Sequence, residues 1–104
     1  MKSVMVRYRV KPDRAAENEK RISSVFEQLA REQHAGLRYA VFKLDDGVSF
    51  VHVASDEATN GRSTLGELSA FKEFTAGIAD RCEELPVVTQ LTIVGAYTGA
   101  RDES

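Results

Sequence analysis

Residues 3–11 alternate between two kinds of side chain. This period of two predicts a strand with two different faces, one carrying Val4, Val6, Tyr8 and Val10 and the other carrying Met5, Arg7, Arg9 and Lys11. After Pro12 the period becomes helical, because apolar residues recur on one stripe at Ile22, Val25, Phe26 and Leu29. Gly36 is the expected end of this helix.

The rest of the chain reads as two strands, a helix and a last strand. Strands are predicted at 37–45 and 48–54, joined by a tight turn at Asp46-Gly47, and 55–63 reads as a polar loop. A second helix is expected from Thr64 to Pro86, with a core stripe at Leu68, Phe71, Ile78, Cys82 and Leu85. The last strand is predicted at 87–97, and 98–104 reads as a flexible tail.

This order is β-α-β-β-α-β, the pattern of α+β, ferredoxin-like folds. It predicts one domain over residues 1–104, with a core at about 3–97. The expected architecture is a four-stranded antiparallel sheet with both helices on one face.

The predicted hairpin assigns side chains to faces. A two-residue turn pairs Lys43 with Phe50, Val41 with His52 and Tyr39 with Ala54, and it also pairs Phe42 with Val51 and Ala40 with Val53. The second set is more uniformly apolar, so we expect it under the helices. In the last strand, Leu91 and Ile93 are expected on the helix side, opposite Val88, Gln90, Thr92 and Val94.

The other face would then leave apolar residues in water among polar ones, which is typical of an interface or a ligand groove. We expect a homodimer whose facing sheets enclose a cavity for a small organic ligand. The candidate ligand-binding residues are Arg7, Arg9, Tyr39, Phe50, His52, Gln90 and Thr92.

His52 is the candidate catalytic residue. Near Arg7 or Arg9, it could help to bind a carboxylate or enolate oxygen and move a proton. The alternative is an inert, hydrogen-bonded histidine in an interface, and the arginines would then be solvated or form salt bridges. Tyr39 has the same two interpretations, as a ligand contact or as an interface residue.

Composition narrows the function classes. The 104 residues carry 14 Lys plus Arg and 16 Asp plus Glu, a net charge of −2, which does not favour a nucleic-acid or anionic-membrane partner. The single cysteine, Cys82, reads as a core residue and, with no transmembrane run or secretory signal apparent, suits a cytoplasmic protein. No motif for a metal or a nucleotide cofactor is present, so we expect neither.

The chain resembles the dimeric α/β-barrel superfamily, and most nearly the antibiotic biosynthesis monooxygenase-like domains. The resemblance covers roughly residues 3–97 and rests locally on the third strand and acidic turn, residues 49–57 (SFVHVASDE), followed after a loop by residues 68–74 (LSAFKEF). It implies a homodimer with a cavity. Several such proteins oxidise aromatic polyketides or quinols without metal or flavin, and one branch degrades haem.

The chain departs from that family at its functional positions. It has no tryptophan, Ser63, Thr64 and Leu65 offer no histidine, and the first strand lacks the asparagine of the haem-degrading branch. Three hypotheses therefore stay open. The first is a dimer binding an aromatic or carboxylate-bearing ligand, the second a cofactor-independent monooxygenase or isomerase acting on a quinol or polyketide-like substrate, and the third a purely structural dimer.

Overall fold

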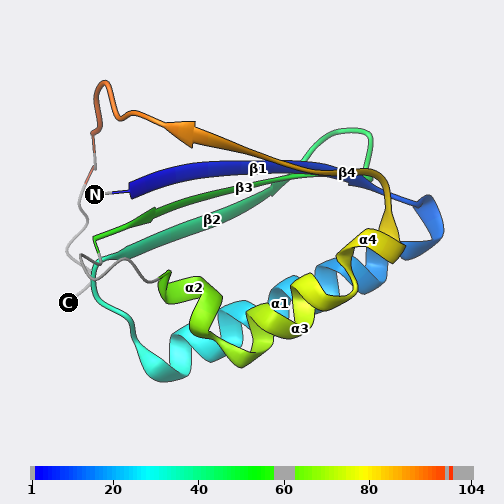
Figure 1. The fold of residues 1–104 in the computed structure, drawn as a ribbon, viewed down its shortest axis with the longest axis horizontal. Helices are drawn as coiled ribbons and strands as arrows, with labels where there is room; N and C mark the ends of the chain where they lie inside the picture. Colours follow the sequence, from blue (N-terminus) through cyan, green and yellow to red (C-terminus); the bar gives the residue numbers. More distant parts are fainter. Residues whose placement is uncertain (1, 58–62, 98, 100–104) are drawn as a thin grey trace.

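The computed structural model describes residues 2–57, 63–97 and 99. Four strands form one antiparallel sheet in the order β2-β3-β1-β4, and the helices all lie on one of its faces (Figure 1). The elements are β1 (Lys2–Val10), the 3-10 turn η1 (Pro12–Arg14), α1 (Ala15–Glu32), β2 (Leu37–Lys43), β3 (Ser49–Asp56), α2 (Thr64–Glu67), α3 (Ser69–Ala76), α4 (Ile78–Arg81) and β4 (Cys82–Leu91). The predicted α+β, ferredoxin-like architecture is confirmed.

Helix α1 ends earlier than its glycine signal indicates. Gln33 adopts a left-handed conformation with φ 54°, and its N–H donates to the carbonyl of Leu29. This satisfies one of the carbonyls that a helix end leaves open. Gly36, with φ 85°, lies in the link to β2, where its carbonyl accepts from the N–H of Glu57.

In place of the predicted second helix, the structure has three short helices. The predicted last helical turn, from Cys82 to Leu85, is part of a strand. Leu68 is extended and buried between α2 and α3, and Gly77 separates α3 from α4. The chain becomes a strand at Cys82, so Leu85 is 62% exposed and Pro86 lies inside β4. A proline, which has no N–H to donate, is tolerated there because β4 is an edge strand.

The hairpin has the predicted register but a different turn. Lys43 pairs with Phe50, Val41 with His52 and Tyr39 with Ala54, as expected. Gly47 has φ 77° and donates to the carbonyl of Leu44, so the turn begins one residue earlier than a two-residue primed turn. The Asp46 carboxylate accepts from the Ser49 hydroxyl and from the N–H groups of Val48 and Ser49, which lowers its pKa to about 2.

The face assignment of β2, β3 and β4 is wrong. Directly paired residues share a face, and β1 pairs Tyr8 with Phe50 and Val6 with His52. Since Tyr8 packs under the helices against Phe74, Phe50 and His52 lie on the same side. Val88 and Gln90 pair with Val6 and Val4 and join them on the helix face.

The uniformly apolar hairpin residues Ala40, Phe42, Val51 and Val53 therefore lie on the face that no helix covers. We call this the outer face, and its residues are Met5, Arg7, Arg9, Arg38, Ala40, Phe42, Val51, Val53, Val87, Thr89 and Leu91. Phe42 is 56% and Val87 64% exposed. Such an apolar surface on a sheet is typical of an interface.

The remaining sequence predictions concern the loop after β3, the C-terminal tail, Cys82 and membrane-spanning segments. Ser55 and Asp56 continue β3 rather than beginning a loop. Residues 58–62 of the predicted loop and, apart from Gly99, the predicted tail at 98–104 lie outside the described residues. Cys82 is buried in the core, as predicted. In the described part of the chain no helix combines the length and apolar character needed to cross a bilayer.

Candidate functional site

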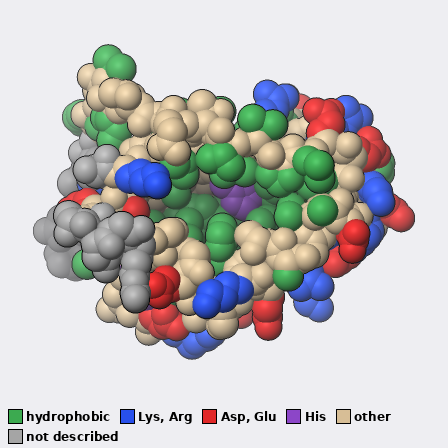
Figure 2. Space-filling view, viewed as in Figure 1, with side chains coloured by type: hydrophobic (Ala, Val, Ile, Leu, Met, Phe, Trp, Pro, Cys, Tyr) green, Lys and Arg blue, Asp and Glu red, His purple; other side chains and the backbone are tan. Residues whose placement is uncertain are grey.

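A cavity of about 500 Å³ lies within the protomer, between the sheet and the helices. The strands contribute Val4, Val6, Tyr8, Tyr39, His52 and Ala54, and the helices contribute Leu65, Phe71, Phe74, Thr75 and Ile78. Pro86 and Val88 of β4 line it too, and the charged Lys2 and Asp56 belong to its lining. Figure 2 shows the hollow, with hydrophobic side chains around a histidine. This size and apolar character suit a small organic ligand.

His52 is held between two tyrosines in the cavity wall. Its Nε2 lies 2.7 Å from the hydroxyl of Tyr8, and its Nδ1 lies 2.6 Å from the hydroxyl of Tyr39. The ring also packs against Phe74, with centroids 5.4 Å apart. Three separate elements, β1, β2 and β3, thus position one imidazole.

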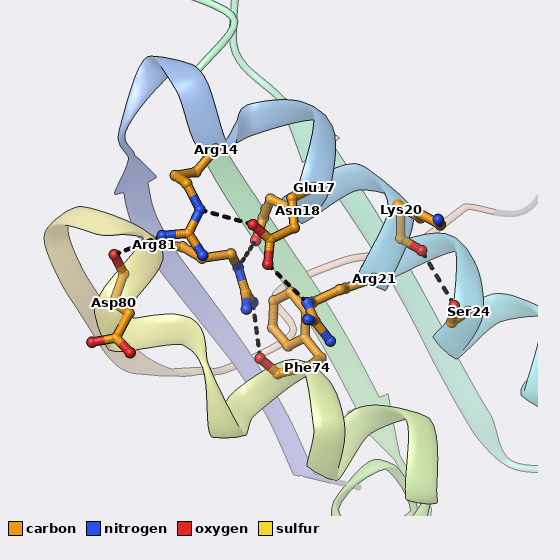
Figure 3. A network of polar contacts seen from close by, with 9 residues as sticks. All are labelled: Arg14, Glu17, Asn18, Lys20, Arg21, Ser24, Phe74, Asp80 and Arg81. Atoms are coloured by element: carbon orange, nitrogen blue, oxygen red, sulfur yellow. Dashed lines mark hydrogen bonds and ion pairs between the residues drawn. The ribbon is translucent and has the colours of Figure 1, made fainter.

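The polar contacts continue from Tyr8 away from the cavity. Asn18 of α1 is fully buried, and its Nδ2 donates to the Tyr8 hydroxyl at 2.9 Å. Its Oδ1 accepts from Nε of Arg81 at 3.1 Å, and Arg81 also donates to the carbonyl of Phe74 (Figure 3). We call Arg81, Asn18, Tyr8, His52 and Tyr39 the polar chain. Within the described residues it leaves no buried side-chain nitrogen or oxygen without a partner.

Burial determines the charge states in this chain. It lowers the pKa of His52 to about 4, so the imidazole is neutral at pH 7. Burial also raises the pKa of both Tyr8 and Tyr39 far above their usual value, so both hydroxyls keep their protons. Burial lowers the pKa of Arg81, whose guanidinium also stacks over the Phe74 ring at 5.1 Å. The chain is thus neutral except at its buried arginine.

The structure places the candidate ligand-binding residues in different parts of the molecule. Tyr39 and His52 meet in the cavity, and Phe50 lies in the core, stacked on Tyr8. Arg7 and Arg9 lie on the outer face, so the expected approach of His52 to these arginines is wrong. Arg9 instead approaches Glu83 and Glu84. Gln90 is an exposed residue of β4, and Thr92 follows the end of that strand.

The sequence reasoning missed Asn18 and Arg81. A signal for them was available, because Asn18 precedes Ile22 by four residues and Arg81 follows Phe74 by seven. These spacings place a polar residue on the apolar stripe of each helix. Buried polar side chains need partners, so such positions point to a hydrogen-bond network.

No group of three or more His, Cys, Asp or Glu side chains that could hold a metal ion occurs among the residues that the structure describes. The polar side chains that line the cavity are Tyr8, His52 and Tyr39 of the polar chain, together with Lys2, Asp56, Ser63 and Thr75.

Solved structures with the same fold were found by comparison. A protein described as an antibiotic biosynthesis monooxygenase superposes with a TM-score of 0.72 at 17% identity, over 91% of this chain and 100% of its own. Rv0793 from Mycobacterium tuberculosis gives 0.72 at 18%, over 93% and 98%. NE2512 from Nitrosomonas europaea, a protein of unknown function, gives 0.73 at 17%, over 96% and 95%.

These similarities confirm the resemblance at the level of the fold. The chain has the ferredoxin-like fold of structures described as antibiotic biosynthesis monooxygenases. At identities of 17–18%, the similarity shows a shared fold only, so the function has to be argued from the site. No family model matches the sequence, and no curated protein matches it.

Proposed function

We propose that this protein binds a small aromatic molecule in the cavity between its sheet and helices α2–α4. The observation that carries the proposal is a largely apolar cavity of about 500 Å³ with His52 and Tyr39 in its wall. Apolar walls supply most of the affinity for such a ligand, and a few placed polar groups orient it. Aromatic side chains of α3, Phe71 and Phe74, line the same space.

A carboxylate-bearing ligand is less well supported at this position. The arginines that suggested it, Arg7 and Arg9, lie on the outer face. Burial of His52 keeps its imidazole neutral, so it offers no positive charge to an anion. Lys2 and Asp56 add one charge of each sign to the lining, so the cavity favours a neutral ring system.

Filling the cavity should abolish binding. Ala54 of β3 lines the cavity, and Ala54→Phe places a ring in it. We expect quinoline to bind the unmodified protein and Ala54→Phe to weaken that binding at least about tenfold, measured by NMR titration. Ala30→Phe, an exposed position on α1 outside the cavity, is the matched control. Equal binding by Ala54→Phe, or no binding of neutral aromatic compounds to the unmodified protein, would contradict the proposal.

We also propose that the protein is a homodimer that joins two outer faces. The exposed apolar residues of that face come from both sheet edges, with Phe42 on β2 and Val87 and Leu91 on β4. Val51 and Val53 of β3 lie between them and are half-buried. A two-fold axis through this face would bury the same patch on both copies.

A cofactor-independent monooxygenase or isomerase is the second candidate function. It is supported by the neutral imidazole beside two tyrosine hydroxyls, a set of groups that can accept and return a proton from a bound phenol or enol. The fold is also that of a protein described as an antibiotic biosynthesis monooxygenase.

The monooxygenase candidate predicts turnover that depends on His52. In air, oxidation of a hydroquinone or an anthrone should exceed the rate without protein, and His52→Gln should lower the excess about 100-fold. His34→Gln is the matched control, because His34 contacts Glu32 at the end of α1 and lies outside the cavity. Turnover that is unchanged in His52→Gln would argue against this mechanism.

A further inference from the structure

The polar chain has a donor at one end that cannot accept a hydrogen bond. Arg81 carries only N–H donors, and its Nε points at Asn18. The Asn18 atom that faces Arg81 must therefore be the carbonyl oxygen Oδ1. This turns the amide nitrogen Nδ2 toward Tyr8, to which it donates.

The orientation of Asn18 determines the next two hydrogen bonds. Because the Tyr8 oxygen already accepts from Asn18, the Tyr8 O–H is left to donate to Nε2 of His52. If Nε2 carried the imidazole proton instead, the Tyr8 oxygen would face two donors. Its own proton would then have no acceptor among the described residues, which is costly because Tyr8 is only 3% exposed, whereas Tyr39 is half-buried.

His52 therefore carries its proton on Nδ1 and donates to the Tyr39 hydroxyl. The imidazole is neutral, so it has one N–H to give. The Tyr39 oxygen accepts this proton, and among the described residues it has no second side-chain hydrogen bond. Its O–H remains available to the cavity that Tyr39 lines.

We infer that the polar chain runs in one direction, from Arg81 through Asn18, Tyr8 and His52, and makes Tyr39 a hydrogen-bond donor that selects ligands with an acceptor atom. Carbonyl oxygens and aromatic ring nitrogens are acceptors of this kind. Asn18 and Arg81 are positioning residues, because they act on the ligand only through the chain. The ligand preference rests on the proposed binding function, whereas the direction of the chain does not.

Asn18→Asp should reverse the direction while keeping the shape of the side chain. A carboxylate only accepts, so one oxygen would pair with Arg81 and the other would take the Tyr8 O–H. The Tyr8 oxygen would then accept from Nε2–H, and Nδ1 would accept from Tyr39. Tyr39 would present lone pairs, rather than a proton, to the cavity.

The tautomer of His52 tests the direction without any ligand. Nitrogen-15 NMR of histidine-labelled protein at neutral pH should show a proton on Nδ1 of His52 in the unmodified protein and on Nε2 in Asn18→Asp, with His34 as an internal reference. Tyr39→Phe should keep the proton on Nδ1, because the Tyr8 side of the chain is unchanged. A proton on Nε2 in the unmodified protein, or no change in a folded Asn18→Asp, would overturn the inference.

Three bicyclic probes of similar shape test the selection. Quinoline offers an acceptor, indole a donor and naphthalene neither. Quinoline should bind about tenfold tighter than naphthalene, the effect of one well-placed hydrogen bond, and Asn18→Asp should remove this advantage and favour indole. Equal affinities of all three would overturn the selection by Tyr39. Absence of binding by all three would refute the binding function and leave the tautomer result as the test of direction.

Discussion

Phe50→Ala is expected to lower the free energy of unfolding by about 3–5 kcal/mol, the usual cost of deleting a buried aromatic ring. Phe50 is 1% exposed and stacks on Tyr8 with ring centroids 5.6 Å apart. Truncation would leave a void beside the ring of Tyr8, whose hydroxyl is hydrogen-bonded to His52. Urea unfolding followed by circular dichroism measures the change in free energy.

Phe42→Ala is the matched control on the opposite face of the same hairpin. Phe42 is 56% exposed, so in protein diluted until monomeric its loss should cost less than about 1 kcal/mol. The loss from Phe50→Ala should persist at every protein concentration, since it lies inside the protomer. A larger cost at Phe42 than at Phe50 in the monomer would contradict the faces seen in the structure.

Phe42→Asp is expected to convert the proposed homodimer to monomers. Each copy would carry the new carboxylate into the same apolar interface, and burial of an unpaired charge costs several kcal/mol. We expect the dissociation constant to rise more than about 100-fold, and sedimentation velocity at micromolar concentration measures it.

The control for this substitution lies on the other layer of the molecule. Ser23→Asp adds the same charge at an exposed position of α1, away from the outer face, and should leave the dimer unchanged. The proposal fails if the unmodified protein is monomeric at micromolar concentration, or if Phe42→Asp remains dimeric.

The hairpin shows what a local sequence pattern can and cannot predict. A short turn between two alternating segments predicts which residues pair, and Val41 does face His52. Pairing does not say which face of the hairpin is covered. The uniformly apolar set, such as Phe42 with Val51, read as the core, but the register of β1 against β3 places Phe50 and His52 under the helices. That register joins distant parts of the chain.

In the second predicted helix, by contrast, the helical periodicity of the sequence continues beyond the point where the helices end in the structure. A helical stripe continues through Cys82 and Leu85, but residues 82–91 pair with β1 as an edge strand. The hydrogen bonds of that strand require a partner that the local sequence does not contain. Tertiary pairing therefore overrides the helical period.

The order of the elements, the hairpin register and a titratable histidine on a strand could be predicted from local patterns, because these features depend on neighbours along the chain. Which face the helices cover depends on packing between distant segments, and this packing places His52 in a cavity rather than beside Arg7 and Arg9. It also brought together Asn18 and Arg81, which are 63 residues apart. Burial and hydrogen bonding between distant segments set the charge and orientation of the site, and no local pattern contains that information.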